Sequence, residues 1–525
     1  MGLPEARTWL EKPVILIEKV MAKNRMAIYG TVAFAILAMI AWIYRSINHN
    51  YRLFNDPKSG AFFSYIHTDL TEELRKELDL TYDPLCIFLF KKDLQNRPIL
   101  HLQKLCQAIQ QHLSKTRDYR IMVKYIEGDP SNFDPKKLAD SLSNTTDTGG
   151  VFRDYLGELT KNLVSRLPSC FTGQPQALIP SAVNNAPALV QIFKDLGRLM
   201  MYCYNSYEEA QTPEGKIFIG RLIGRNFDDA LFSAILSLSA EDIDAPKELS
   251  FEAKVKIYSA LVESRIDTGE NVHWLKQTLQ KIGTASNRLN SEEEIRQFMD
   301  SLGMTVEELP RAFTLWNKVH VRAIKQDPEK FIEKVLNCTL KKSTGIEPGQ
   351  MFGPVLMIAK GMKEFCRPGR SDDSTQQQNH RWDKTIRHIN YKAFSAKVQG
   401  SLLTPAFRQS IVENIIIDKE CNPKIVLDVT ALKEWILNPN TPDEKIRLFL
   451  KFATGATTLL PGQKLTILAR DSKGIVPCAS TCAYTLTFAK EYPDEFAHST
   501  FDRDKKFIDI FVQEMERTVD QFDRK

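Results

Sequence analysis

The feature that most constrains the fold is the stretch at residues 475–488, close to the end of the chain. Its sequence is Ile-Val-Pro-Cys-Ala-Ser-Thr-Cys-Ala-Tyr-Thr-Leu-Thr-Phe. From Tyr484 to Phe488 large apolar residues alternate with threonines, which predicts a strand with one buried face. The residues before it contain a proline and two cysteines, and they predict a loop. Cys482 therefore lies where a loop enters a strand, so rigid structure can hold its thiol in reach of solvent.

The cysteines as a set predict neither a metal site nor a disulfide framework. The chain has nine, at positions 86, 106, 170, 203, 338, 366, 421, 478 and 482. No pair has CxxC spacing and no histidine cluster accompanies them, so we expect no zinc and no other cofactor. Their odd number and irregular spacing favour reduced, mostly buried thiols in a cytosol-facing protein.

Composition places the chain among ordinary globular proteins. It has 525 residues, of which 43% are hydrophobic and 26% charged, enough for roughly two to four domains. The net charge of +5 is small for this length, and no basic tract is present. We therefore expect no nucleic acid partner.

Residues 26–44 contain no charged side chain. Nineteen helical residues rise about 28 Å, close to the hydrocarbon thickness of a bilayer of about 30 Å. Tyr29, Trp42 and Tyr44 lie near the two ends, where interfacial aromatic residues are common. A cleaved signal peptide has a shorter apolar run and small residues at its cleavage site. The segment predicts a single transmembrane helix, with a buried core helix as the alternative.

From about residue 60 the pattern becomes that of a mainly helical soluble domain. Residues 84–90 and 120–126 read as strands, and the apolar positions of 100–113 fall on one helical stripe. At 147–155 the sequence is Asp-Thr-Gly-Gly-Val-Phe-Arg-Asp-Tyr. Two adjacent glycines after an aspartate predict a turn with unusual backbone angles at the start of a helix.

Three segments together resemble ligases of the HECT type, a family that transfers ubiquitin. The family's catalytic loop is close to Leu-Pro-x-Ala-His-Thr-Cys, and it is matched by Val476, Pro477, Ala479, Thr481 and Cys482. Ser480 stands where the family has histidine. Residues 147–155 are similar to its Asp-x-Gly-Gly-Val-x-Arg-Glu-aromatic motif. Residues 449–455, Phe-Leu-Lys-Phe-Ala-Thr-Gly, are similar to its Leu-Leu-Gln-Phe-Val-Thr-Gly.

The resemblance implies an α+β, bilobal fold over about residues 60–525, with a large, mainly helical N-lobe and a small α/β C-lobe after the membrane segment. The expected parts are an N-terminal segment 1–25, the transmembrane helix 26–44, a linker 45–59, an N-lobe 60–417, a hinge 418–424 and a catalytic C-lobe 425–525. Within the N-lobe, about 240–345 corresponds to the family's subdomain for the ubiquitin-conjugating enzyme.

The resemblance also implies the chemistry. Cys482 would accept ubiquitin as a thioester from a conjugating enzyme and pass it to lysines of protein substrates, with Thr481 in a supporting role. Phe522 is the fourth residue from the end, where the family has a phenylalanine that positions the C-lobe. It is also the last member of an apolar stripe in the final helix, formed by Phe507, Phe511, Met515, Val519 and Phe522. Packing alone is therefore an alternative role for Phe522.

Two other functions remain open at this point. A thiol peptidase, for example a deubiquitinase, needs a histidine to activate its cysteine and a third group to orient that histidine. His498 is the only histidine after His388. A lone cysteine is more often a small buried apolar residue, which would leave a non-catalytic, membrane-tethered scaffold. Cys478 stands at a variable position of the family loop, so we expect it to be dispensable.

Location follows from the predicted span and the chemistry. Basic residues are slightly more numerous before residues 26–44 than after them, which favours a cytosolic N-terminus. Ubiquitin and its conjugating enzymes, in contrast, require the catalytic region to face the cytosol. We expect a single-pass membrane protein with a cytosolic catalytic region. The membrane would belong to a host cell if the protein is a bacterial effector.

Overall fold

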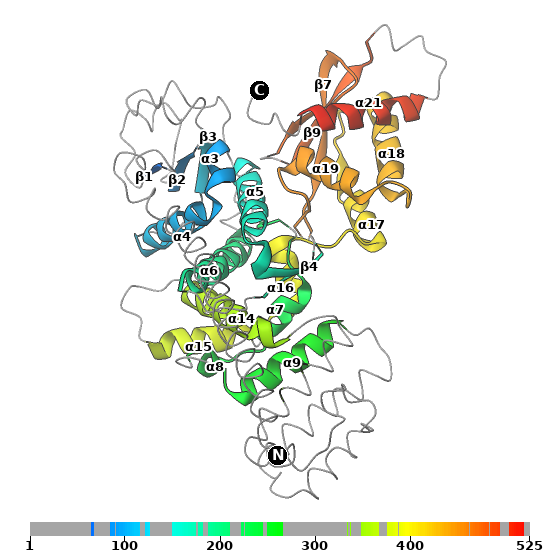
Figure 1. Cartoon of the computed structure of the whole chain (residues 1–525). Coiled ribbons are helices and arrows are strands. Elements are labelled where there is room, and N and C mark those ends of the chain that lie inside the picture. The colour runs from blue at the N-terminus through cyan, green and yellow to red at the C-terminus, as the bar shows by residue number, and fades with distance from the viewer. Residues whose placement is uncertain are drawn as a thin grey trace, which may run out of the picture. The chain divides into compact units, whose positions relative to one another are not determined.

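The computed structural model shows a mixed α/β protein that is mostly helical, with small sheets (Figure 1). The residues that it describes are 65–67, 85–89, 91–115, 121–125, 150–174, 177–181, 187–210, 222–224, 226–244, 249–265, 333, 337, 348–366, 375–386, 388–460, 462–481, 484–493 and 503–518. Their buried apolar side chains form two large clusters. The first core comprises residues from Ile87 to Val398, and the second core comprises residues from Ile411 to Met515.

The first core begins with a three-stranded sheet in the order β1-β2-β3, made of β1 (Tyr65–His67), β2 (Leu85–Leu89) and β3 (Ile121–Tyr125). Strands β2 and β3 are parallel, and α3 (Lys91–Asn96) and α4 (Pro98–Lys115) connect them. Both strands predicted from the sequence are confirmed. The stripe on α4 is also confirmed, because Leu102, Leu105 and Ile109 are buried. Helix α5 (Gly150–Arg166) begins at the second residue of the double glycine, where the sequence predicts the start of a helix.

Two long helices, α6 (Pro187–Ala210) and α14 (Pro348–Glu364), pack against each other in the middle of this core. The other elements of the first core are η4 (Pro168–Cys170), β4 (Phe171–Gln174), β5 (Ala177–Pro180), α7 (Asp229–Leu236), α8 (Ala240–Asp244), α9 (Phe251–Arg265), α15 (Thr375–Ile386) and α16 (Tyr391–Gln399). Helices α8 and α9 contribute Ile243, Ile257 and Leu261 to the first core. The beginning of the predicted subdomain at 240–345 is therefore part of this core, and most of its remainder lies outside the described residues.

The second core is built on a four-stranded sheet in the order β6-β7-β9-β8. Strand β7 (Leu465–Lys473) is parallel to β6 (Ile415–Ile417) and to β9 (Thr485–Glu491), whereas β8 (Cys478–Ser480) is antiparallel to β9. The helices are α17 (Pro405–Glu413), α18 (Pro423–Leu437), α19 (Asp443–Thr454) and α21 (Arg503–Thr518). Figure 1 shows α18, α19 and α21 beside this sheet. Leu486 and Phe488 of β9 are fully buried, as the alternation predicts.

The change from one apolar core to the other lies close to residue 400. Val398 is the last residue of the first core, and Leu403 already packs against the second. The predicted hinge at 418–424 instead lies inside the second core, between β6 and α18, where the amide of Asp418 donates to the carbonyl of Ile467 at 3.0 Å. Helix α17 and strand β6, which precede the predicted lobe boundary at 417, bury apolar residues in the second core.

The membrane location expected from the sequence is withdrawn. None of the helices in the described part of the chain is long and apolar enough to cross a membrane. Residues 26–44, the predicted span, lie outside the described residues, as do 1–25 and 45–59.

Candidate functional site

The three sequence motifs meet at one side chain, Arg153 of α5. Its Nε atom donates to the carbonyl oxygen of Thr454 at 2.9 Å, and its Nη2 atom donates to that of Thr481 at 2.5 Å. The guanidinium carbon lies 4.3 Å from the ring centroid of Tyr484. Only 1% of Arg153 is exposed. One buried cation thus joins segments about 300 residues apart in sequence: 147–155, 449–455 and 475–488.

Helix α5 can present Arg153 in this way because its apolar residues anchor it in the first core. Phe152, Leu156 and Leu159 are fully buried there. Residues three or four apart lie on the same side of a helix, so these side chains fix the rotation of α5 about its axis. Arg153 is thereby directed at residues of the second core. A buried guanidinium needs acceptors for its donors, and the two carbonyl groups serve as such.

A second contact between α5 and α19 lies beside the first. The ammonium of Lys451 is 3.1 Å from a carboxylate oxygen of Asp154 and 3.2 Å from one of Glu158. Burial acts to lower the pKa of Lys451, but the two carboxylates outweigh it, and the pKa lies above its ordinary value. Helix α19 ends one turn later at Gly455, which has a φ of +74° and donates its amide to the carbonyl of Lys451. Lys451 and Thr454 are therefore both held in the last turn of α19.

The turn between β8 and β9 is short and contains an unusual residue. Ser480 pairs with Thr485, so only residues 481–484 connect the two strands. Tyr484 has a φ of +52° and is the one residue other than glycine with a positive φ in the part of the chain that the structure describes. The left-handed conformation costs roughly 1–2 kcal/mol for such a residue. It persists here with the ring buried and with the carbonyl of Tyr484 accepting from the amide of Thr466 at 2.9 Å.

Of the predicted site residues Thr481, Cys482 and Phe522, the structure describes Thr481. Thr481 lies in this turn, half-buried, and it contacts Arg153 through its backbone carbonyl. Cys482 and Ala483 lie outside the described residues, as does Phe522. The residues on either side of Cys482 and Ala483 are both in contact with Arg153. The structure therefore fixes the two ends of the turn that carries Cys482.

Cys478 lies outside this turn, because it is the first residue of strand β8. The sequence predicts a loop here, but Cys478 to Ser480 form β8, with Cys478 opposite Thr487. The thiol of Cys478 is exposed and accepts from Nη1 of Arg470 at 2.8 Å. Ser480, which stands in place of the family histidine, is also exposed. Cys478 therefore belongs to a strand of the second sheet and not to a loop.

Sequence reasoning assigned no role to Arg153 or Lys451, although both lie in quoted motifs. The signal in the sequence was weak, because each of the two helices carries several other charged side chains. Only the tertiary structure shows that these charges meet partners from the other core.

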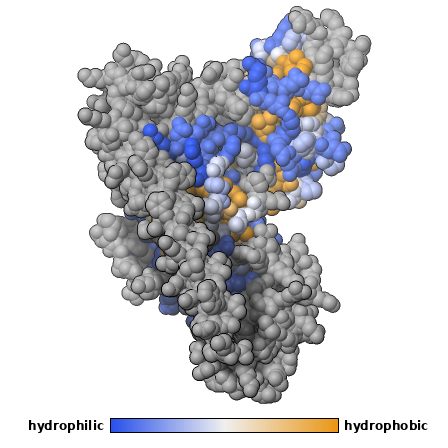
Figure 2. Space-filling view, in the orientation of Figure 1, coloured by the Kyte–Doolittle hydropathy of each residue, from blue (hydrophilic) through white to orange (hydrophobic). Residues whose placement is uncertain are grey.

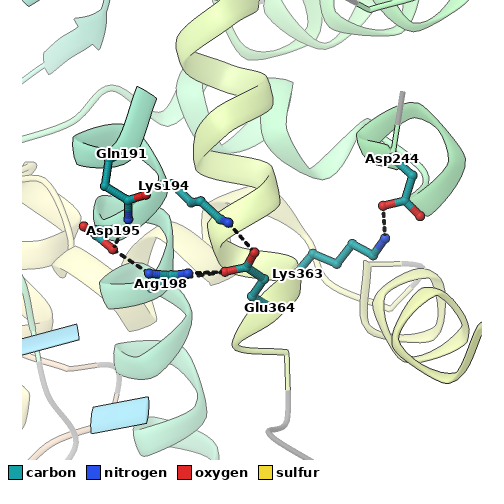
Figure 3. Close-up of polar contacts among 7 residues, drawn as sticks. All are labelled: Gln191, Lys194, Asp195, Arg198, Asp244, Lys363 and Glu364. Carbon is teal, nitrogen blue, oxygen red and sulfur yellow. Dashed lines mark hydrogen bonds and ion pairs between the residues drawn. The ribbon is translucent and has the colours of Figure 1, made fainter. Parts of the chain in front are cut away.

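A further group of charged residues cross-links α6 and α14 and has a structural explanation (Figure 3). Arg198 donates to Asp195 at 2.7 Å and to Glu364 at 2.5 Å, and Lys194 also pairs with Glu364. Burial raises the pKa of Asp195, although Gln191 and Arg198 both donate hydrogen bonds to it. Each charge in this group has an opposite charge beside it, so the group stabilises the helix pair and we assign it no chemistry.

Several large apolar side chains are exposed among the described residues, namely Leu402, Ile416, Val426, Leu427 and Leu437. All of them lie on β6 or α18, or just before α17 in the chain. Figure 2 shows hydrophobic patches interspersed with hydrophilic residues over the upper part of the view.

The described residues also contain no group of three or more histidine, cysteine or acidic side chains that could hold a metal ion.

Comparison with protein-family models and with curated proteins found no match to this chain.

Proposed function

We propose that this protein is a ubiquitin ligase of the HECT type, with the first core in the place of the N-lobe and the second in the place of the C-lobe. The observation that supports the proposal is the meeting of three family-like motifs at Arg153. Each motif alone has a simple local explanation as a turn, a helix end or a strand entry. Their contact in space is what a shared site predicts.

The proposed reaction uses the thiolate of Cys482 as a nucleophile. It attacks the carbonyl carbon of the thioester between ubiquitin and the conjugating enzyme, and the thiolate of that enzyme leaves. The amine of a substrate lysine then attacks the new thioester, loses a proton, and releases Cys482. The first step exchanges one thioester for another, so it depends on positioning more than on a strong base. A free cysteine with a pKa near 8.5 already supplies a few per cent of thiolate at neutral pH.

Thr481 has a supporting role in this proposal, through the backbone carbonyl that binds Arg153. Phe522 is proposed to position the C-lobe during transfer to the substrate. It follows the stripe of α21, in which Phe507, Phe511 and Met515 are fully buried. If Phe522 acts in transfer, Phe522→Ala should still form the ubiquitin adduct but discharge it to lysine more slowly, at unchanged stability.

The proposal is tested by incubating the full chain with a ubiquitin-charged conjugating enzyme. We expect an adduct of one ubiquitin that disappears on reduction with a thiol. Cys482→Ala should abolish it, and Cys478→Ala is the matched control because the exposed Cys478 should be dispensable. An adduct that persists in Cys482→Ala contradicts the proposal.

The same experiment separates the alternatives. A thiol peptidase would form no adduct from the charged conjugating enzyme, but it would react with ubiquitin that carries an electrophile at its C-terminus. A scaffold would react with neither reagent. Repeating both reactions with Cys482→Ala and Cys478→Ala shows which cysteine each reaction requires.

A further inference from the structure

We propose that helices α5 and α19 form a releasable lock between the two cores. The lock consists of Arg153 on α5 with its contacts in the second core, and of Lys451 on α19 with its contacts on α5. Release of one of these two cations frees the other, while each core stays folded. The lock goes beyond the proposed function, because its opening and closing involve no ubiquitin.

The two cores share little apolar packing. Their buried side chains form separate clusters, and the apolar link between them in the described part of the chain is a small cluster of Tyr207, Leu222, Ala456 and Leu460. Permanent contacts between folded units are mostly large and apolar, whereas smaller and more polar contacts within one chain permit the units to move. Polar groups therefore decide whether these two cores stay together.

The two cations reach across the contact in opposite directions. Arg153 extends from α5 to the end of α19, where its Nε atom donates to the carbonyl of Thr454 at 2.9 Å. Lys451 extends from α19 to α5, where its ammonium lies 3.1 Å from Asp154 and 3.2 Å from Glu158. Asp154 directly follows Arg153, and Lys451 lies one turn before Thr454, so both contacts join the same turns of the same two helices. A movement that separates these turns breaks both contacts, and each contact holds the turns close enough for the other to form.

The lock can open because its groups are charged. An ammonium, a guanidinium or a carboxylate that leaves its partner regains water, so the net free energy of such a contact is much smaller than its strength in the closed state. The side chains of Lys451 and Glu158 are 18% and 24% exposed, and water therefore already reaches them. Exposure of the apolar residues in either core has no such compensation, so the cores can part at the lock without unfolding.

The chain passes between the cores through a short segment that can accommodate this movement. Val398 is the last residue of the first core, Leu403 packs on the second, and residues 400–404 belong to no helix or strand. Gly400 has a φ of +79°, a conformation that glycine adopts without strain. The dihedral angles of residues 401–404 can therefore change without breaking the backbone hydrogen bonds of a helix or a sheet.

The test measures how fast a low concentration of N-acetoxysuccinimide acetylates individual lysines of the full chain, by mass spectrometry of its peptides. Lys451 reacts when it leaves its carboxylates, so its rate reports the opening of the lock. Arg153→Gln should accelerate acetylation of Lys451 roughly tenfold to hundredfold, because hydrogen bonds of a charged group typically stabilise by an amount of that order. Arg198→Gln is the matched control, because it alters an arginine that binds Asp195 and Glu364 within the first core. It should leave the rate at Lys451 at the wild-type value.

Two other lysines report whether the cores themselves stay folded. Lys254 of α9 pairs with Glu333, and its side chain is 17% exposed against 18% for Lys451. Lys424 pairs with Asp428 in α18 of the second core, and its side chain is 12% exposed. Neither of these two rates should change when Arg153 is replaced. A wild-type rate at Lys451, or a rise at all three lysines together, overturns the lock.

Tyr484→Leu serves if Arg153→Gln does not fold. It removes the ring whose centroid lies 4.3 Å from the guanidinium carbon, and it leaves both helices of the lock unchanged. Acetylation of Lys451 should accelerate roughly threefold to thirtyfold, the range of a buried cation–π contact, with Lys254 and Lys424 unaffected. An unchanged rate at Lys451 in this variant contradicts the lock.

The coupling must also act in the reverse direction, because a coupling free energy is the same from either side. Lys451→Met should therefore accelerate the modification of Arg153 by phenylglyoxal roughly tenfold, as expected for the loss of a partly buried ion pair. Arg153 is only 1% exposed in the closed state, and Arg198 is the internal control whose rate should not change. If Arg153 reacts no faster in Lys451→Met than in the wild type, the two contacts are independent and the lock is overturned.

Discussion

Two glycines determine how closely the central helices of the first core approach. A Cβ atom added to Gly197 of α6 would lie 2.0 Å from the carbonyl oxygen of Ile358, and one added to Gly361 of α14 would lie 1.8 Å from that of Lys194. The obstructing atoms are backbone, so no side chain rotation can relieve them. Each helix therefore uses a glycine to admit the backbone of the other, and the ion pairs of Arg198 and Lys194 lie beside this contact.

The variant Gly197→Ala should reduce the free energy of unfolding by about 3 kcal/mol, the upper end of the usual cost of overpacking. Gly157→Ala is the matched control, because it also changes a helical glycine, but an added Cβ atom there meets nothing within 4 Å. It should increase stability by about 0.5–1 kcal/mol through helix propensity. Urea unfolding followed by circular dichroism measures both values. Similar effects in the two variants would contradict the close-approach explanation.

At the scale of elements, α5 is a helix with contacts in both cores. One side packs in the first core through Phe152 and Leu156, and other residues bind the second core through one buried cation and two carboxylates. Breaking a buried pair costs several kcal/mol, whereas an exposed pair contributes little. The side chains of Lys451 and Asp154 are 18% and 11% exposed, so their contribution lies between these limits.

Lys451→Met should therefore lower the free energy of unfolding by about 1–3 kcal/mol at neutral pH. The pKa of Lys451 is raised in the folded protein, so its stabilising effect is complete below the unfolded value of about 10.4 and is lost as pH rises through the folded value. The difference between wild type and Lys451→Met should thus stay constant from pH 7 to 9 and shrink above pH 10. Lys451→Arg keeps its charge and should show no such decline. A difference independent of pH would contradict the ion-pair account.

At the scale of the whole described molecule, the two cores are connected at more than one place. Gly400 ends α16 with a φ of +79°, and the next residue, Ser401, hydrogen-bonds through its backbone with the hydroxyl of Thr458. Close by in sequence, Ala456 and Leu460 form a small apolar cluster with Tyr207 and Leu222. Thr454, Ala456, Thr458 and Leu460 thus all interact with residues that precede the second core in the chain.

Gly400→Ala should destabilise this junction for two reasons, the positive φ and a contact of 2.0 Å between the new Cβ atom and Cγ2 of Thr458. We expect a loss of about 2–4 kcal/mol in the free energy of unfolding, from about 1–2 for the backbone and the rest for overpacking. Adding Thr458→Ala should recover the steric part only, less the cost of the lost hydrogen bonds. Thermal unfolding and limited proteolysis of residues 400–404 measure the effect. Full recovery in the double variant would show that the backbone conformation contributes nothing.

Local patterns predicted the elements well where one side of an element is buried in its own core. The stripe on α4, the strands β2, β3 and β9, and the buried residues of α21 follow from side-chain periodicity, which depends only on neighbours along the chain. The predicted hinge at 418–424 has the composition of a turn, and a turn inside a core looks the same in sequence as a turn between cores. Likewise, Cys478 was placed in a loop because three residues are too few to show a strand pattern.

The sequence by itself determined the helices and strands, the two cysteines of interest and the motifs that suggest ubiquitin transfer. These properties depend on residue type and spacing, which are local. Only the tertiary structure decided that Arg153, Thr454, Thr481 and Tyr484 meet, that Lys451 finds two carboxylates, and that the two cores separate near Gly400. Such contacts join residues hundreds of positions apart. They depend on how whole elements pack, which no pattern within one segment contains.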